Sequence, residues 1–134
     1  MLDHIFLAVN DTDRSIAFYT QALAPLGITV RLDYDGKDGP PGHPDLKGFG
    51  AHGRIFFWLR TGQPGGSATH VGFVANSESQ VDAAYAAAMA AGATDHGAPG
   101  ARLYYDPRYY AAGVIDPDGH TLEFVYKSWQ HTPS

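Results

Sequence analysis

The segment His4-Ile-Phe-Leu-Ala-Val-Asn10 returns 66 positions later as His70-Val-Gly-Phe-Val-Ala-Asn76. Each copy is a short run of strand-forming residues that opens with a histidine and leads into an amphipathic helical pattern. The repeat predicts two related modules, with one histidine at the same place in each. A pseudo-twofold axis between such modules can bring two histidines together, and histidine is a common metal ligand. Metal binding is therefore the first functional hypothesis.

Both copies alternate apolar residues in the manner of a strand with one buried face. The residues that we expect to pack under a helix are Ile5, Leu7, Val9, Val71, Phe73 and Ala75. This arrangement leaves His4 and His70 on the opposite face of the sheet.

A helix is predicted after each repeated strand. The first runs from about 13 to 23 and is ended by Pro25 and Gly27. The second begins at a capping box of Ser77 and Gln80 and stops at Gly92. Its apolar stripe consists of Val81, Ala84, Tyr85, Ala88 and Met89. Both halves read strand, helix and further strands, which indicates a duplicated α+β unit in a single domain over residues 1–134.

Two segments outside the repeats have turn or loop composition. Residues 33–53 are rich in glycine and proline, so we predict a long irregular loop, either a lid over the site or a flexible insertion. Strand character resumes at 54–60. The last two strands, 109–115 and 120–126, are joined by Asp116-Pro-Asp-Gly119, which favours a type I turn followed by a left-handed glycine.

The composition excludes several classes of function. A formal net charge of −5 leaves no basic surface for nucleic acid or an anionic membrane. No apolar run approaches the ~18 residues of a membrane span. The chain has no cysteine, so any metal would be held by histidine and carboxylate. The start shows no secretory signal, and we interpret the chain as a cytoplasmic protein.

Glu123 lies within an apolar strand sequence, Thr-Leu-Glu-Phe-Val. Burying an unpaired carboxylate is costly, so this residue either faces solvent or has a partner. Taken alone, the solvent-facing explanation is the simpler one. Combined with His4 and His70, however, Glu123 completes a set of two histidines and one carboxylate, which holds a divalent ion and leaves coordination positions open.

A family resemblance rests on the same residues. The motifs are H-x-x-x-x-V from His4, D-x-x-R-S-x-x-F-Y from Asp11, His70 itself, and the closing DPDGHTLEF. Together they resemble the glyoxalase/bleomycin resistance/dioxygenase group, the vicinal-oxygen-chelate superfamily, over nearly the whole chain. The resemblance implies two βαβββ modules, about 1–62 and 68–127, whose sheets form a cup around a metal. It also implies His4, His70 and Glu123 as ligands of a divalent iron, manganese, nickel, zinc or cobalt ion.

The fourth ligand position departs from the family pattern. Glyoxalase I enzymes have a glutamate there, whereas the 66-residue spacing applied to Glu123 gives Phe57, which can neither bind a metal nor take a proton. His52 is the only nearby histidine that could replace it. A three-ligand site resembles fosfomycin-resistance transferases and extradiol dioxygenases. Both commonly have a tyrosine three residues before the D-P turn, where this chain has Gly113.

The strand before the turn predicts a roomy substrate pocket. If Gly119 is a bulge, the odd-numbered residues of 109–113 share the face of Glu123, whereas a one-residue slip would place Tyr110 and Ala112 there. In both registers small residues lie nearest the metal and a tyrosine lies farther out. The predicted pocket, with Arg108 as an anion contact, consists of Phe57, Arg108, Tyr109, Ala111 and Gly113.

The favoured function is a metal-dependent, glyoxalase-like lyase or isomerase acting on a small substrate with adjacent oxygens, with the ion as a Lewis acid. The alternatives are an extradiol-type dioxygenase, a fosfomycin-resistance-like transferase with a thiol cosubstrate, and a non-catalytic bleomycin-resistance-like binding protein. No residue identifies a catalytic base. Because an open cupped sheet leaves edges to cover, we predict a homodimer. Relatives combine the modules within one chain or exchange them between subunits, and both arrangements stay open here.

Overall fold

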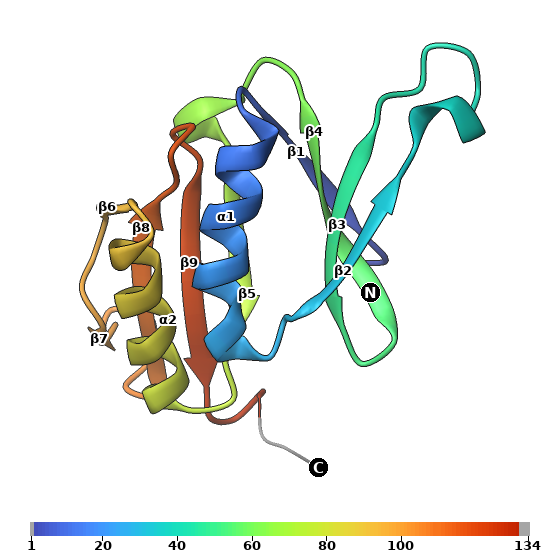
Figure 1. Cartoon of the computed structure of the whole chain (residues 1–134). Coiled ribbons are helices and arrows are strands. Elements are labelled where there is room, and N and C mark those ends of the chain that lie inside the picture. Colours follow the sequence, from blue (N-terminus) through green and yellow to red (C-terminus); the bar gives the residue numbers. More distant parts are fainter. Residues whose placement is uncertain (1, 132–134) are drawn as a thin grey trace.

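The computed structural model describes residues 2–131 and shows two β-sheets with two helices side by side (Figure 1). The first sheet has the order β1-β4-β3-β2 and the second β5-β9-β8-β6, with β7 also paired to β8. The helices are α1 (Thr12–Leu23) and α2 (Glu78–Ala90), and the short 3-10 helices are η1 (Ala24–Leu26), η2 (Gly36–Asp38) and η3 (Gly66–Ala68). The strands are β1 (Ile5–Val9), β2 (Val30–Tyr34), β3 (Leu46–Ala51), β4 (Arg54–Thr61), β5 (His70–Val74), β6 (Thr94–Asp95), β7 (Gly100–Ala101), β8 (Tyr109–Ile115) and β9 (Thr121–Lys127). The chain therefore has the predicted α+β fold of two modules.

The repeated strands bury the faces that the sequence predicts. Leu7 and Val9 of β1 are buried, and so are Val71 and Phe73 of β5. The histidine at the start of each repeat is exposed. The alternation in the sequence thus separates a helix-facing side from an open side in both sheets.

Both helices begin and end close to the predicted residues. The side chain of Asp11 accepts a hydrogen bond from the Arg14 backbone N–H at the start of α1, and Ser77 caps α2 in the same way. Gly27 and Gly92 follow the helical segments with φ of 78° and 107°, a conformation that glycine adopts readily. No helix among residues 2–131 has the length and apolar character needed to cross a membrane.

The helices join the two sheets into one core. The ring of Tyr19 on α1 lies 4.9 Å from that of Phe57 in the first sheet, and Phe57 lies 5.3 Å from Phe73 in the second sheet, measured between ring centroids. In Figure 1, α1 and α2 run side by side along the second sheet, with the first sheet on the other side of α1. The sheet faces that point away from this core are left open.

The pairing of parallel strands defines equivalent positions in the two modules. Gly72 pairs with Glu123, and Phe6 pairs with Trp58. Gly72 and Phe6 each lie two residues after the repeated histidine, so Trp58 is the counterpart of Glu123. The prediction that Phe57 occupies this position is wrong by one residue. Because side chains alternate along a strand, Phe57 points into the core and is fully buried.

The segment 33–53 is more regular than its composition predicts. Strand β3 occupies its second half, so the irregular part shrinks to residues 35–45. Glycines that suggested a loop allow close packing within the sheet instead. A Cβ on Gly48 would lie 2.6 Å from the Trp58 ring, and one on Gly50 would lie 1.8 Å from the carbonyl oxygen of Arg54.

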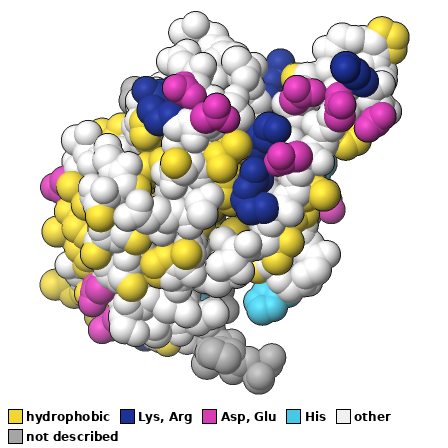
Figure 2. All heavy atoms as spheres, in the orientation of Figure 1, with side chains coloured by type: hydrophobic (Ala, Val, Ile, Leu, Met, Phe, Trp, Pro, Cys, Tyr) yellow, Lys and Arg dark blue, Asp and Glu magenta, His cyan; other side chains and the backbone are white. Residues whose placement is uncertain are grey.

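Strands β2 and β3 with their connection form an arm that projects from the body (Figure 1). Figure 2 shows basic and acidic side chains along this projection. Asp33 pairs with Arg31 at 3.0 Å and with Lys47 at 3.3 Å. The arm is therefore stabilised by the hydrogen bonds between β2 and β3 and by its own ion pairs.

Candidate metal and substrate site

Three polar side chains meet on the open face of the second sheet, one from each of three neighbouring strands. His70 begins β5, Glu123 lies within β9, and Tyr109 begins β8. His70 Nε2 lies 3.1 Å from Glu123 Oε1, and the Tyr109 hydroxyl donates to Glu123 Oε2. Two of the three predicted ligands, His70 and Glu123, are thus brought together.

Thr121 sets the orientation of the His70 ring. The Thr121 hydroxyl donates to the carbonyl oxygen of Thr69 at 2.9 Å, so its oxygen is left to accept from His70 Nδ1, also at 2.9 Å. In the neutral ring, this network places the proton on Nδ1 and leaves a lone pair on Nε2. That lone pair faces a carboxylate oxygen. Two such acceptors repel each other unless a cation or a second proton lies between them.

The His70–Glu123 pair fits a divalent ion. An ion about 2.1 Å from a nitrogen and an oxygen ligand places adjacent ligand atoms about 3.0 Å apart in octahedral coordination and about 3.4 Å apart in tetrahedral coordination. The 3.1 Å between Nε2 and Oε1 lies within this range. In metal sites the second nitrogen of a histidine ligand and the second oxygen of a carboxylate ligand are usually hydrogen-bonded, as they are here. The competing state is an imidazolium paired with the carboxylate.

Strands β8 and β9 pair in the register that a bulge at Gly119 predicts. Gly113 lies opposite Glu123, so Tyr109 and Ala111 share its face, and Gly119 has a φ of 92°. Burial and the hydrogen bond to Glu123 raise the pKa of Tyr109 above its usual value. Tyr109 therefore stays protonated at neutral pH and serves as a hydrogen-bond donor to the carboxylate.

Gly113 is a glycine because the chain approaches it closely. A Cβ there would lie 2.7 Å from the carbonyl oxygen of His96. The backbone of Gly113 also accepts from the N–H of His96 at 2.9 Å and donates to the carbonyl of Gly97 at 2.8 Å. A tyrosine at position 113 would displace this segment. The hydroxyl that reaches the carboxylate comes instead from Tyr109, four residues earlier.

A small cavity of about 110 Å³ adjoins this group. Its lining includes the predicted pocket residues Ala111 and Gly113, together with the exposed rings of Tyr104 and Tyr105. Arg108 is not part of this lining.

Arg108 is already paired. Its Nε and Nη2 each donate to Asp106 at 3.0 Å, and its guanidinium lies over the Trp129 ring. These hydrogen bonds lower the pKa of Asp106 to about 2. The guanidinium of Arg108 is thus neutralised by Asp106, and Arg108 does not line the cavity as the predicted anion contact would.

His4 lies on the other sheet, apart from His70 and Glu123. Its Nδ1 is 2.6 Å from Asp3 Oδ2. His4, His52 and His70 all line a cavity of about 570 Å³, and Phe57 reaches its wall. Within residues 2–131, however, no group with mutually close ligand atoms contains His4. A single chain therefore does not gather the three predicted ligands.

The open face of the first sheet is aromatic where that of the second is polar. Trp58, the counterpart of Glu123, is half-buried on this face beside Phe6, whose side chain is 54% exposed. Neither residue offers a metal ligand. Any ion at the candidate site would therefore depend on the histidines and Glu123. The fourth ligand of the family pattern is still missing, but the residue at its position is Trp58 and not Phe57.

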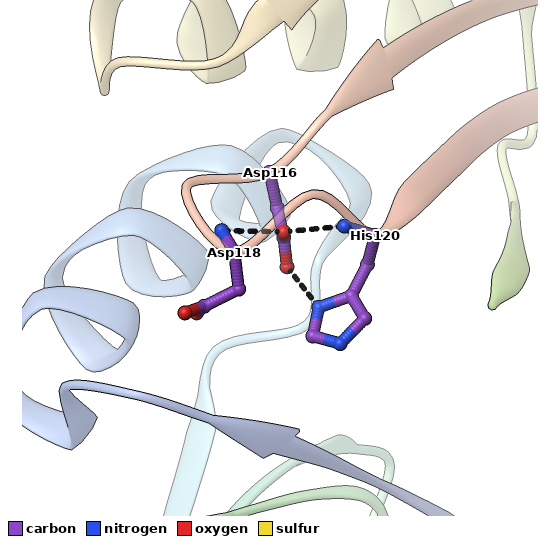
Figure 3. A group of neighbouring side chains, drawn as sticks. All are labelled: Asp116, Asp118 and His120. Carbon is purple, nitrogen blue, oxygen red and sulfur yellow. Dashed lines mark hydrogen bonds and ion pairs between the residues drawn. The ribbon is translucent and has the colours of Figure 1, made fainter. Parts of the chain in front are cut away.

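A second polar group, the turn cluster, consists of Asp116, Asp118 and His120 (Figure 3). Asp116 Oδ2 accepts from the Tyr19 hydroxyl at 2.5 Å and lies 2.8 Å from His120 Nδ1. Asp116 and His120 are buried and Asp118 is half-buried. The cluster connects the β8–β9 hairpin of the second module to α1 of the first. Sequence reasoning did not single it out. Its one signal is the aspartate at the first turn position, which accepts from backbone N–H groups there.

The turn cluster has ligand atoms within 4.8 Å of one another, the spacing that an ion needs, and it is the one such group within the part of the chain described here. Its carboxylates already accept hydrogen bonds from other groups, however. Asp118 accepts from the Arg14 guanidinium at 3.0 Å and from the Ser15 hydroxyl at 3.2 Å. An ion would have to displace a cation and several neutral donors. We interpret the turn cluster as a structural clasp between the modules.

Comparison with known proteins gives a consistent result. The sequence model of the Glyoxalase/Bleomycin resistance protein/Dioxygenase superfamily matches residues 1–124. A glyoxalase/bleomycin resistance protein from Albidiferax ferrireducens T118 has 29% identity and a TM-score of 0.75, with 94% of this chain and 98% of that chain covered. A domain from Frankia sp. EAN1pec has 20% identity and a TM-score of 0.68, covering 95% of this chain and 97% of that one.

The fosfomycin resistance protein FosX from Listeria monocytogenes has 18% identity and a TM-score of 0.68, with 99% of this chain and 98% of that chain covered. At such identities the similarity to FosX and to the Frankia domain supports the fold alone. No curated protein matches the chain.

Proposed function

The chain belongs to the glyoxalase/bleomycin resistance protein/dioxygenase superfamily, and within it we propose a metal-dependent enzyme of lyase or isomerase type. Its substrate would be a small molecule with adjacent oxygens. His70 and Glu123 would bind the ion, together with His4. The observation that carries the proposal is the 3.1 Å between His70 Nε2 and Glu123 Oε1, with Nδ1 of the same ring 2.9 Å from the Thr121 hydroxyl, an arrangement that a cation would stabilise.

A divalent ion bound there would supply a Lewis acid that polarises a substrate oxygen. The protein's own groups prepare the position. Thr121 holds the His70 ring in the tautomer that exposes Nε2, and Tyr109 holds one carboxylate oxygen of Glu123 so that the other faces the ring. Gly72 pairs with Glu123, and a Cβ at Gly72 would meet nothing within 4 Å, so the sheet is open for substrate at that position.

We propose that a second copy of the chain completes the ligand set with its own His4. Strands β1 and β5, which begin at or just after the repeated histidines, are both unpaired edges of their sheets. Phe6 on β1 and Val74 on β5 are 54% and 51% exposed. Joining β1 of one copy to β5 of another would cover these edges. It would also bring a histidine from the first sheet to the His70–Glu123 pair.

Metal uptake tests the proposal. Purified protein titrated with Mn(II), Ni(II) and Zn(II) should bind about one ion per chain, and His70→Ala should abolish this binding. His43→Ala, in the arm, is the matched control and should bind as the wild type does. Wild-type protein that takes up none of these ions, with His70 remaining in an ion pair with Glu123, would overturn the metal site.

A mixing experiment tests whether the site is shared between copies. His4→Ala and His70→Ala proteins should each fail to bind metal, but a refolded equal mixture should recover about a quarter of the wild-type sites, because half of the dimers carry one intact site. If each chain holds its own site, the mixture recovers nothing.

The aromatic face around Trp58 favours one second candidate, a non-catalytic ligand-binding protein. Such a protein would bind an apolar ligand equally well with and without metal. Ligand affinity measured before and after treatment with a chelator separates the two functions.

A further inference from the structure

We propose that Arg60, with Phe6 and Trp58, forms a subsite for an anionic oxygen group of the substrate, a carboxylate or a phosphonate. This subsite rests on the proposed function for its place in the reaction, whereas its ability to bind an anion is independent of any metal. It would make the substrate of this protein an anion with an apolar or planar body.

Strand pairing places Arg60 on the open face of the first sheet. Ala8 pairs with Arg60, and Phe6 pairs with Trp58. Leu59, which lies between Trp58 and Arg60 on β4, is fully buried on the opposite side of the sheet. Arg60 follows Trp58 by two residues, which is about 7 Å along a strand. The guanidinium therefore lies beside the position that corresponds to Glu123 in the other module. An anionic group bound there would leave the rest of the substrate free to extend over Trp58.

Among the contacts within residues 2–131, Arg60 differs from the other arginines in having no oxygen partner. The others donate to a carboxylate or a backbone carbonyl: Arg14 to Asp118, Arg31 to Asp33, Arg54 to Asp3, Arg102 to Ala98 and Arg108 to Asp106. Within residues 2–131, the Arg60 guanidinium contacts only the Phe6 ring and lies 5.6 Å from its centroid. A contact of this kind leaves the N–H donors of the guanidinium unused.

The chemistry of the guanidinium defines the ligand. Its planar N–H groups match the two oxygens of a carboxylate or phosphonate and bind them with paired, charge-assisted hydrogen bonds. The rings of Phe6 and Trp58 provide apolar walls for the body of the ligand. Because the formal net charge of the chain is −5, an anion would not be attracted by the protein as a whole. Binding would depend on this one local cation.

Tryptophan fluorescence gives a direct test. The chain has two tryptophans, so a Trp129→Phe background leaves Trp58 as the sole reporter. In chelator-treated protein, benzoate and phenylphosphonate should both change the Trp58 emission with saturation, and benzyl alcohol, a neutral analogue, should bind more weakly. A preference for one anion identifies which oxygen group the subsite takes.

Variants in the same background locate the binding. Arg60→Gln should raise the dissociation constant of benzoate about tenfold to a hundredfold, the loss expected for a charge-assisted pair, and leave that of benzyl alcohol unchanged. Arg60→Lys should recover part of the affinity. Lys37→Gln removes the same charge from the arm and should have no effect.

Equal affinity of Arg60→Gln and the parent protein for benzoate would overturn the subsite, as would equal loss in Lys37→Gln. Metal titration of the same samples keeps the two proposals apart. If Arg60-dependent anion binding is found without metal uptake, the subsite stands and the metal-dependent function fails. If metal binds and benzoate does not, the reverse holds.

Discussion

The open faces of the two sheets differ at equivalent positions. The second sheet has His70, Gly72 and, paired with Gly72, Glu123. The first sheet has His4, Phe6 and, paired with Phe6, Trp58. The strand order and the parallel pairing of the two sheets correspond. The faces that pack against the helices also correspond, since both are apolar and buried. Only the open faces have different chemistry: that of the second module is polar, whereas that of the first is aromatic with one arginine.

The contrast follows from what each face has to do. A helix-facing residue must fill the shared core, and a change there costs stability through a cavity or strain. An open-face residue carries little of that constraint. The second module can therefore hold candidate metal ligands while the first holds a candidate substrate wall. The duplicated fold thus supplies two similar sheets, one with candidate metal ligands and one with a candidate substrate-binding surface.

The largest effect should come from breaking the clasp that joins the modules. Asp116→Ala leaves Tyr19, His120 and two backbone N–H groups without their acceptor, so we expect the free energy of unfolding to fall by about 3–5 kcal/mol. Urea unfolding followed by circular dichroism measures this loss. Asp13→Ala, an exposed aspartate in the first turn of α1, is the control. A loss no greater than that of the control would contradict the clasp.

The second prediction sets equivalent positions of the two sheets against each other. Glu123→Ala should weaken metal binding by more than about a hundredfold, the upper end of the loss caused by groups that only support a ligand. Trp58→Ala should leave metal affinity nearly unchanged, because an indole is not a ligand. Calorimetric titration with Mn(II) or Zn(II) measures both variants. An equal loss of metal affinity in the two variants would contradict the assignment of the metal site to the second module.

Tyr109 should have a smaller effect on the same titration. Tyr109→Phe removes the donor that holds one oxygen of Glu123, and loss of such a supporting hydrogen bond lowers metal affinity about tenfold to a hundredfold. Tyr105→Phe is the control, since the rings of Tyr105 and Tyr109 lie 4.9 Å apart. Wild-type affinity in Tyr109→Phe would show that the hydroxyl does not orient the carboxylate.

Alkaline pH should weaken the connection between the modules. Burial, with Asp116 beside it, raises the pKa of Tyr19 well above its usual value of about 10. The folded state thus keeps a proton that the unfolded chain loses, so its stabilising effect is complete below about pH 10 and declines as the pH rises further. We expect a contribution of about 1.4 kcal/mol per pH unit from this group.

Unfolding free energies measured between pH 9 and 11.5 test this contribution. The slope should be shallower in Tyr19→Phe than in the wild type. Tyr110, whose hydrogen bond to Asp82 raises its pKa to about 12, adds to the slope in both proteins and cancels in the comparison. Identical slopes would exclude Tyr19 as a source of the pH dependence.

Much of the fold could be predicted from local sequence signals. The alternation around His4 and His70, the cap at Ser77 and the turn ending at Gly119 each depend on neighbouring residues, and the structure confirms them. The prediction of a long loop over 33–53 was wrong for its second half, which forms β3, because glycine is found in two kinds of structure. It favours loops, but it also permits close packing between strands, as at Gly48 and Gly50.

By itself the sequence determined the two modules and their helix-facing residues, because the alternation of side chains along a strand is a local property. Only the tertiary structure decided that His70 meets Glu123 and that Trp58, not Phe57, corresponds to Glu123. It also decided that His120 is buried in a clasp and that, within residues 2–131, the Arg60 guanidinium contacts the Phe6 ring and no oxygen atom. Those features depend on which distant strands pair and in which register. Register is fixed by packing of the whole core, and a slip of one residue exchanges the two faces of a strand.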